Sequence, residues 1–305
     1  MARSFEVIYS YAPKAAVSRL EAFRARFPYR NMEHHGQIYR VWDVCDARNS
    51  SFAAVYLPSG LGTGEIWFPY MLYNRMDVRS IALSLAADED PLVLVRAWGE
   101  LLKEMGVQKC VLIGQSIGGL LAQIMAKEFP EMVLGLCLPT CGCPSETLSQ
   151  EVRDTWQLRR KLKRRMSWRS FTTRDRLKMA SEMFNAMCPE DYQESQAFWS
   201  AFIEETFDEY VYKDQYVAVN TQMVPNIYSN IFLKPSDFSD ELKVLILPSQ
   251  GDRTFGEKER GELIKMFPQA QVSDIGRFGA FAMQIDEDRL TEIICGFINS
   301  TIPTV

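Results

Sequence analysis

Cys110-Val111-Leu112-Ile113-Gly114-Gln115-Ser116-Ile117-Gly118-Gly119 is the stretch of sequence that decides the fold of this chain. A short apolar run ends at Gly114, and a stretch with the periodicity of a helix follows it as far as Pro130. The pattern predicts a strand, a tight turn and a helix, with Ser116 at the apex of the turn. Small residues are needed on both sides of that serine, because a side chain there would collide with the neighbouring strand or helix.

This arrangement predicts that the hydroxyl of Ser116 projects over the end of a sheet as a nucleophile. A G-x-S-x-G string is common by chance, and it is the strand-to-helix setting that favours a nucleophile turn over an ordinary glycine-rich turn. A serine also needs a base, usually histidine, and an acid that orients the base. The only two histidines, His34 and His35, precede the serine, whereas in the order serine, acid, histidine the base comes last.

Strands and helices alternate on both sides of this turn. Apolar runs predict strands at 38–44, 52–57, 78–83, 110–113, 133–138, 244–248 and 271–275. Helical spacing predicts helices at 13–28, 91–105, 117–130 and 288–299. Such alternation is typical of a mostly parallel sheet with helices on both faces, in which ligands bind at the carboxyl ends of the strands.

The segment from about 145 to 234 differs from the rest. Its strand signal fades, and aromatic, methionine and charged residues recur at helical spacing. We therefore expect a helical cap at 145–234 inserted into a core formed by 37–144 and 235–305, after an N-terminal helical extension at 1–36. The first cap helix carries apolar residues at helical spacing, which predicts that one side of it is buried: Leu158, Leu162 and Met166. The basic residues at 159–165 then form its solvated face, with an anionic ligand or partner as the alternative.

Composition limits the classes of function. With 305 residues, of which 47% are hydrophobic, the chain can bury the core of one large domain, and a net charge of -5 gives no reason to expect nucleic acid. Seven cysteines without regular spacing, and no segment like a signal peptide, predict a cytoplasmic protein with reduced thiols. No apolar run predicts a membrane span. Cys141-Gly142-Cys143 is interpreted as a loop, and we expect no metal and no cofactor.

With its segments in this order, the chain resembles proteins of the α/β-hydrolase fold, and its segment order is most similar to the maspardin group. The resemblance covers about residues 37–300. Besides the turn at Ser116, it rests on three segments: Val55-Tyr56-Leu57-Pro58-Ser59-Gly60, Leu247-Pro248-Ser249-Gln250-Gly251-Asp252, and Ile275-Gly276-Arg277-Phe278-Gly279-Ala280-Phe281.

The resemblance implies a role for several residues. Ser116 matches the nucleophile and Asp252 the acid, whereas Ala280 stands where the family usually has histidine. For the oxyanion hole it implies the backbone N–H of Ile117 and a second N–H from Ser59 or Gly60. The usual His-Gly pair of that loop is replaced here by Pro58-Ser59, which is a departure from the family pattern.

Two explanations for Ala280 are open. The frame Gly279-Ala280-Phe281 is intact, so the alanine is either a natural loss, as in maspardin-like proteins, or a deliberate inactivating substitution. His34 and His35 could supply a base from the N-terminal segment, but Gly36 beside them favours an exposed hairpin pair.

We expect a serine hydrolase that acts on an ester, thioester, lactone or amide, with a small-molecule or peptide acyl substrate, and that is nearly inactive as written. A non-catalytic binding or adaptor protein, with a protein partner or as a homodimer, is the first alternative. A lyase, acyltransferase or cyclase on the same scaffold is the second.

Overall fold

A computed structural model describes residues 3–45, 51–74, 78–85, 90–165, 178, 192–208, 222–252 and 254–302, without the side chains of 74, 159–165, 208 and 280. Eight strands form one sheet in the order β1-β2-β4-β3-β5-β6-β7-β8. β1 and β2 pair antiparallel, as do β2 and β4, and all other pairs are parallel. The strands are β1 Arg30–His34, β2 Gln37–Val44, β3 Phe52–Leu57, β4 Arg79–Leu83, β5 Lys109–Gly114, β6 Val133–Pro139, β7 Lys243–Leu247 and β8 Gln271–Val272.

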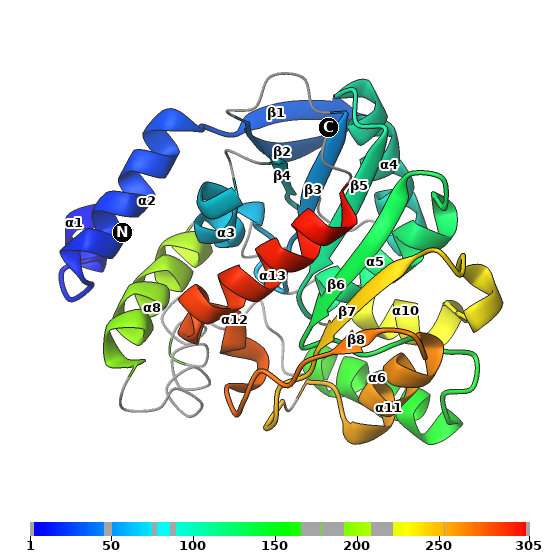
Figure 1. Ribbon diagram of the computed structural model, residues 1–305. Helices are drawn as coiled ribbons and strands as arrows, with labels where there is room; N and C mark the ends of the chain where they lie inside the picture. The colour runs from blue at the N-terminus through cyan, green and yellow to red at the C-terminus, as the bar shows by residue number, and fades with distance from the viewer. Residues whose placement is uncertain are drawn as a thin grey trace.

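Helices cover both faces of this sheet (Figure 1). The α-helices are α1 Phe5–Ile8, α2 Lys14–Arg26, α3 Phe68–Asn74, α4 Pro91–Glu104, α5 Ile117–Glu128, α6 Gln150–Arg165, α8 Gln193–Asp208, α10 Val224–Asn230, α11 Glu257–Met266, α12 Ala282–Ile285 and α13 Glu287–Thr301. Short 3-10 helices are η1 Gly64–Trp67, η5 Pro235–Asp237 and η6 Gly279–Phe281. In Figure 1, α13 and α3 lie in front of the sheet, and α4 and α5 lie behind it.

The two faces of the sheet bury two separate apolar cores. Successive side chains of a strand point to opposite faces, so β3 contributes Ala53, Val55 and Leu57 to the core under α4 and α5. Its remaining buried residues, Ala54 and Tyr56, belong to the core under α3 and α13. Because both faces are covered, β3 and β6 are apolar along their whole length, and β5 is apolar after Lys109.

The hairpin of β1 and β2 contains the strand that the sequence did not reveal. All five side chains of β1 are polar or partly exposed, so no apolar run marks this edge strand. The two-residue turn at His35 and Gly36, with positive φ angles of 50° and 76°, confirms the predicted hairpin. The expectation that both histidines are exposed is corrected for His34, whose side chain is only 12% exposed, against 70% for His35.

Between β6 and β7, the elements within the described residues are the helices α6, α8, α10 and η5, and the cap at 145–234 stays a prediction. The predicted buried side of α6 is wrong at Leu158, which is 56% exposed. Val152 and Trp156, four residues apart, face inward instead, and Leu158 lies about 200° further around the helix than Trp156. Leu162, Met166 and the basic side chains of 159–165 lie outside the described residues. In the described part of the chain, no helix has the length and apolar composition needed to cross a membrane.

Candidate active site

Ser116 stands between β5 and α5 in a backbone conformation that favours glycine. Its φ is 57° and its ψ is -119°. For a residue with a side chain, such a conformation costs about 1–3 kcal/mol, and strained residues of this kind concentrate at functional sites. The amide of Ser116 donates to the carbonyl oxygen of Pro139 at the end of β6, 3.4 Å away. The predicted strand, turn and helix are therefore confirmed, with the serine at the bend.

Three glycines make this bend sterically possible. A Cβ atom on Gly114 would lie 2.3 Å from the carbonyl oxygen of Gly118, and one on Gly118 would lie 2.7 Å from that of Pro58. A Cβ on Gly119 would lie 2.5 Å from the sulfur of Cys141. The first two obstacles are backbone atoms, which have little freedom to move. The predicted need for small residues on both sides of Ser116 is confirmed.

The loop after β3 lies against the first turn of α5, because the Pro58 carbonyl packs over Gly118. Its start is fixed by Trp67, whose indole N–H donates to the carbonyl oxygen of Leu57 at 2.8 Å. Ser59 is 7% exposed and begins a turn that a hydrogen bond from Gly62 N to Ser59 O closes at 3.0 Å. The loop with Ser59 and Gly60 thus lies beside the start of α5, where the first backbone N–H groups, including that of Ile117, have no acceptor within the helix.

Asp252 follows β7 and is buried, with 7% of its surface exposed. Its Oδ1 accepts a hydrogen bond from the amide of Thr254 at 2.7 Å. Its Oδ2 is buried, and no donor among the described residues reaches it. Burial raises the pKa of Asp252, and backbone hydrogen bonds from Thr254 and Phe255 oppose that rise. A carboxylate with one oxygen fixed, and with no donor among the described residues at the other, is suited to orient a catalytic base.

Ala280 lies in η6. One backbone contact just before Ala280 and one side-chain contact just after η6 tie this segment to the rest of the site. The amide of Gly279 is 3.4 Å from the carbonyl oxygen of Gln250, in the loop that carries Asp252. Four residues after Ala280, the side chain of Gln284 pairs with that of Gln115, which precedes Ser116, at 3.3 and 3.4 Å. The segment around position 280 therefore lies between the acid loop and the serine turn. Alanine supplies no titratable group there.

Buried polar atoms behind the serine turn were missed by sequence reasoning. The side-chain amide of Gln123 donates to the carbonyl oxygens of Gly119 and Gly142 at 3.0 and 2.9 Å. Its own Oε1, the hydroxyl of Thr140 and that of Tyr228 are buried without a hydrogen-bond partner in the described residues. Nothing in the spacing of these residues signals the cluster, because they come from α5, the end of β6 and α10.

Cys141, beside this cluster, is the nearest alternative nucleophile. Its sulfur is 3.5 Å from the carbonyl oxygen of Ser116. Burial, followed by the charges of Cys143 and Asp252, raises the pKa of Cys141 well above its ordinary value. The thiol is therefore protonated at neutral pH and a weak nucleophile. Cys141 and Cys143 are free thiols in a loop, as the sequence predicted.

Replacing Asp252 with asparagine is expected to stabilise the protein at neutral pH. A group whose pKa is raised on folding weakens the folded state as pH rises from its unfolded pKa through its folded pKa. The gain from Asp252→Asn should therefore be about 1 kcal/mol at pH 7 and smaller at pH 4, where more of the acid is protonated. Urea unfolding of both proteins at the two pH values measures it. An equal or larger gain at pH 4 would contradict the assigned burial effect.

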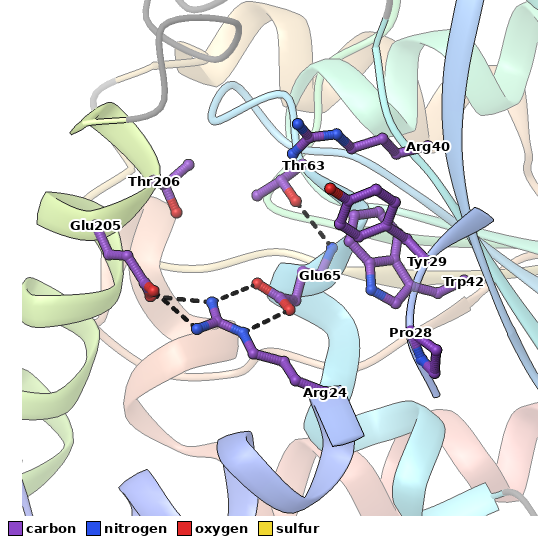
Figure 2. Close-up of a pocket in the computed structure, with 9 residues that line it drawn as sticks. All are labelled: Arg24, Pro28, Tyr29, Arg40, Trp42, Thr63, Glu65, Glu205 and Thr206. Atoms are coloured by element: carbon purple, nitrogen blue, oxygen red, sulfur yellow. Dashed lines mark hydrogen bonds and ion pairs between the residues drawn. The ribbon is translucent and has the colours of Figure 1, made fainter. Parts of the chain in front are cut away.

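A cavity of about 280 Å³ opens where α2, α8, the β1–β2 hairpin and the loop after β3 meet. Figure 2 shows Arg24 at its edge between two carboxylates. Arg24 donates to both oxygens of Glu65, at 2.9 and 2.8 Å, and to both oxygens of Glu205, at 2.8 and 2.9 Å. The hydroxyl of Tyr9 adds a bond of 2.7 Å to Glu205. This network joins the N-terminal helices to α8 and to η1.

Removing the cation of this network is expected to destabilise the fold. Arg24→Met would leave the carboxylates of Glu65 and Glu205 facing each other in a partly buried position, which should cost about 2–3 kcal/mol. Arg96→Met is a matched control, because Arg96 is 57% exposed and makes a single ion pair with Glu128, worth less than about 1 kcal/mol. Urea unfolding compares the two variants. Equal losses would show that the network adds nothing beyond a surface pair.

No protein-family model matches the chain, and no curated protein matches its sequence. Solved structures match its fold. A thermophilic esterase from Thermogutta terrifontis is 17% identical with a TM-score of 0.67, over 90% of this chain and 98% of that one. A mutant meta-cleavage product hydrolase from Pseudomonas fluorescens IP01 is 14% identical with a TM-score of 0.66, over 90% and 98%. An alpha/beta hydrolase fold protein from Chitinophaga pinensis is 13% identical with a TM-score of 0.67, over 91% and 99%. The chain therefore has the predicted α/β-hydrolase fold.

Proposed function

We propose that this protein is a serine hydrolase scaffold that accepts an acyl substrate at Ser116 and turns it over very slowly, because alanine occupies the place of the base. The observation that carries the proposal is the backbone of Ser116, held at φ 57° and ψ -119° at the end of a central strand. The buried carboxylate of Asp252, with its free Oδ2, supports it. Esters, thioesters, lactones and amides of small molecules or peptides share the carbonyl that such a serine attacks.

The proposed reaction begins when the hydroxyl oxygen of Ser116 attacks the substrate carbonyl carbon. The negative charge on the carbonyl oxygen is stabilised by the N–H groups of Ile117 and of Ser59 or Gly60, since preorganised backbone donors need no rearrangement as charge develops. The intermediate expels the alcohol, thiol or amine and leaves an acyl ester on Ser116, which water then hydrolyses. With Ala280, the serine proton passes to solvent, so both steps are slow.

Covalent labelling of Ser116 tests this proposal. We expect a fluorophosphonate probe to modify Ala280→His rapidly and the unchanged protein slowly, because histidine would accept the serine proton and take its orientation from Asp252. Intact-protein mass spectrometry with peptide mapping locates the adduct. Ser116→Ala is the control and should carry none. An adduct of equal size on Ser116→Ala, or no adduct on Ala280→His, contradicts the proposal.

A second candidate function is non-catalytic binding, as a recognition or adaptor protein of the maspardin type. Ala280 favours this binding function, because a site with alanine in the place of the base cannot take the serine proton. The Oδ2 of Asp252, which has no donor among the described residues, would then have no base to orient. A lyase, acyltransferase or cyclase on the same scaffold would use the same nucleophile with another acceptor. Product analysis of Ala280→His with added alcohols and thiols separates transfer from hydrolysis. A stable protein partner captured without any acylation of Ser116 would favour binding.

The cysteines indicate the cellular compartment in which the protein works. No disulfide joins any of the six cysteines that the structure describes, which is typical of a reducing compartment. We therefore place the protein in the cytoplasm, where acyl esters and thioesters of small molecules are within its reach.

A further inference from the structure

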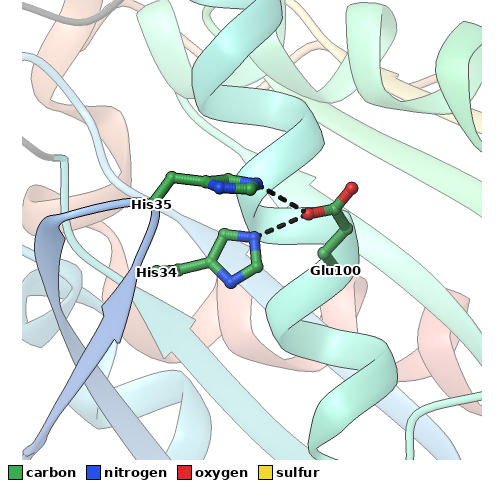
Figure 3. Close-up of side chains that lie close together, drawn as sticks. All are labelled: His34, His35 and Glu100. Carbon is green, nitrogen blue, oxygen red and sulfur yellow. Dashed lines mark hydrogen bonds and ion pairs between the residues drawn. The ribbon is translucent and has the colours of Figure 1, made fainter.

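The two histidines of the chain converge on a single carboxylate far from the serine in sequence. His34 Nε2 lies 2.6 Å from Glu100 Oε2, and His35 Nε2 lies 3.2 Å from the same oxygen. Figure 3 shows the two rings reaching from the hairpin turn to Glu100 on α4. One potential ligand atom from each of the three residues lies within 4.8 Å of the other two. No other histidine exists in the 305 residues.

The hairpin turn brings the two rings to the same side. Neighbouring side chains of a strand point to opposite faces, so adjacent histidines in a regular strand would diverge. His35 instead has a φ of 50°, in the left-handed region, and its ring meets that of His34 edge-on with centroids 4.2 Å apart. The turn type and the packing of α4 over β1 therefore create the cluster.

Glu104 adds a fourth group on the far side of His34. Its Oε1 lies 3.6 Å from His34 Nδ1, while Nε2 of the same ring faces Glu100. With an ion bound, a carboxylate beside Nδ1 would hold the ring proton there and leave the Nε2 lone pair for the metal, as in carboxylate–histidine–metal arrangements.

Simple hydrogen bonding explains the distances when both rings donate to Glu100. A tetrahedral ion with bonds of 2.0–2.1 Å requires about 3.3 Å between ligand atoms. The 3.2 Å separation already fits this value, and the 2.6 Å separation must open by less than 1 Å. Glu100 has 49% of its side chain exposed, and His35 70%, so the groups have room to adjust and an ion can enter from solvent.

We propose that His34, His35 and Glu100 form a binding site for zinc or a similar divalent transition metal ion, with water in the fourth position. Two imidazoles and a carboxylate are a ligand set that zinc accepts. Glu104 is a positioning residue that acts through His34. The ion would fasten the β1–β2 hairpin to α4, so its binding would stabilise the fold independently of any chemistry at Ser116.

Metal binding to the whole chain tests this site. The protein is prepared without a polyhistidine tag and treated with a chelator, and zinc and cobalt are then titrated by calorimetry and visible absorption. We expect one ion per chain, visible cobalt bands typical of four-coordinate nitrogen and oxygen ligands, and a rise in Tm that the chelator reverses. Glu100→Gln should weaken binding by more than about tenfold, and Glu104→Gln by about tenfold, the lower end for a residue that acts through a ligand. His34→Asn/His35→Asn should abolish it.

Glu33→Gln is the matched control, because it removes the same charge from the neighbouring position of the hairpin, where the side chain is exposed. It should bind zinc like the unchanged protein. The proposal is overturned if no ion binds, or if the double histidine variant binds as tightly as the unchanged protein. A sulfur-to-cobalt charge-transfer band would equally overturn it by assigning the ion to cysteine thiols.

Discussion

Ala280→His is expected to raise kcat/KM for a short acyl ester by about 10³-fold over the unchanged protein, within the range of about 10²–10⁴ that a positioned general base contributes. The expectation rests on the two contacts that bracket position 280. Gly279 contacts Gln250 in the loop that carries Asp252, and Gln284 contacts Gln115 next to the serine. The backbone that would carry the histidine is therefore already held between both partners. Initial rates with p-nitrophenyl esters measure the effect.

Asp252 provides the decisive control for this gain. In the Ala280→His background, Asp252→Asn should remove much of the new activity, because an imidazole without its carboxylate is held in the wrong tautomer. In the unchanged protein the same substitution should leave the low rate as it is. Triad members act as a unit, so the two effects should be strongly non-additive. Ala280→Gln, which fills the position without a base, should stay at background. A gain of the same size from glutamine would contradict a role for proton transfer.

Gly114→Ala is expected to destabilise the protein by more than about 3 kcal/mol, at the severe end of single substitutions. The added Cβ would lie 2.3 Å from the Gly118 carbonyl oxygen and 2.4 Å from its carbon. β5 cannot move away, because it is paired on both sides, with β3 and with β6. The midpoint and slope of urea unfolding measure the loss. A loss of less than 1 kcal/mol would show that the turn adjusts freely.

Gly261→Ala is the matched control for the same change at a site with space. Gly261 lies inside α11, and nothing stands within 4 Å of the Cβ that would be added. Alanine should stabilise the helix there by about 0.5–1 kcal/mol, because glycine loses more backbone entropy on folding. Opposite signs for the two glycine substitutions would separate the steric demand of the serine turn from a general effect of helix propensity.

The sequence predicted those parts of the fold whose signal is local. β3 begins and ends at the residues that its apolar run marked, and α4 begins at Pro91, after an Asp90 whose side chain caps the helix. β1 was missed because its stability comes from pairing with β2 and from contacts with distant residues, not from its own composition. Likewise, the apolar spacing at Leu158 predicted the wrong face of α6, because the direction of the core is set by tertiary packing.

In the candidate site, too, residues with a local sequence signal were found, and contacts between distant segments were not. Ser116 was found through a motif whose glycines are neighbours in sequence, and the resemblance to a family supplied Asp252 and position 280. The free Oδ2 of Asp252 and the Gln115–Gln284 pair depend on segments that meet only in three dimensions. The convergence of His34 and His35 on Glu100 is hidden for the same reason, since 66 and 65 residues separate the partners. For that reason, nothing in the sequence pointed to a metal site at these residues.

The backbone conformation of Ser116 is relevant to whether its hydroxyl oxygen acts as a nucleophile. A side chain at φ 57° and ψ -119° raises the free energy of the folded state, and replacing Ser116 with glycine would remove about 1–3 kcal/mol of this strain. Non-covalent recognition of a ligand's shape does not require a serine hydroxyl at this strained position. The oxygen atom at this position is what the proposed covalent attachment of an acyl group to Ser116 would require.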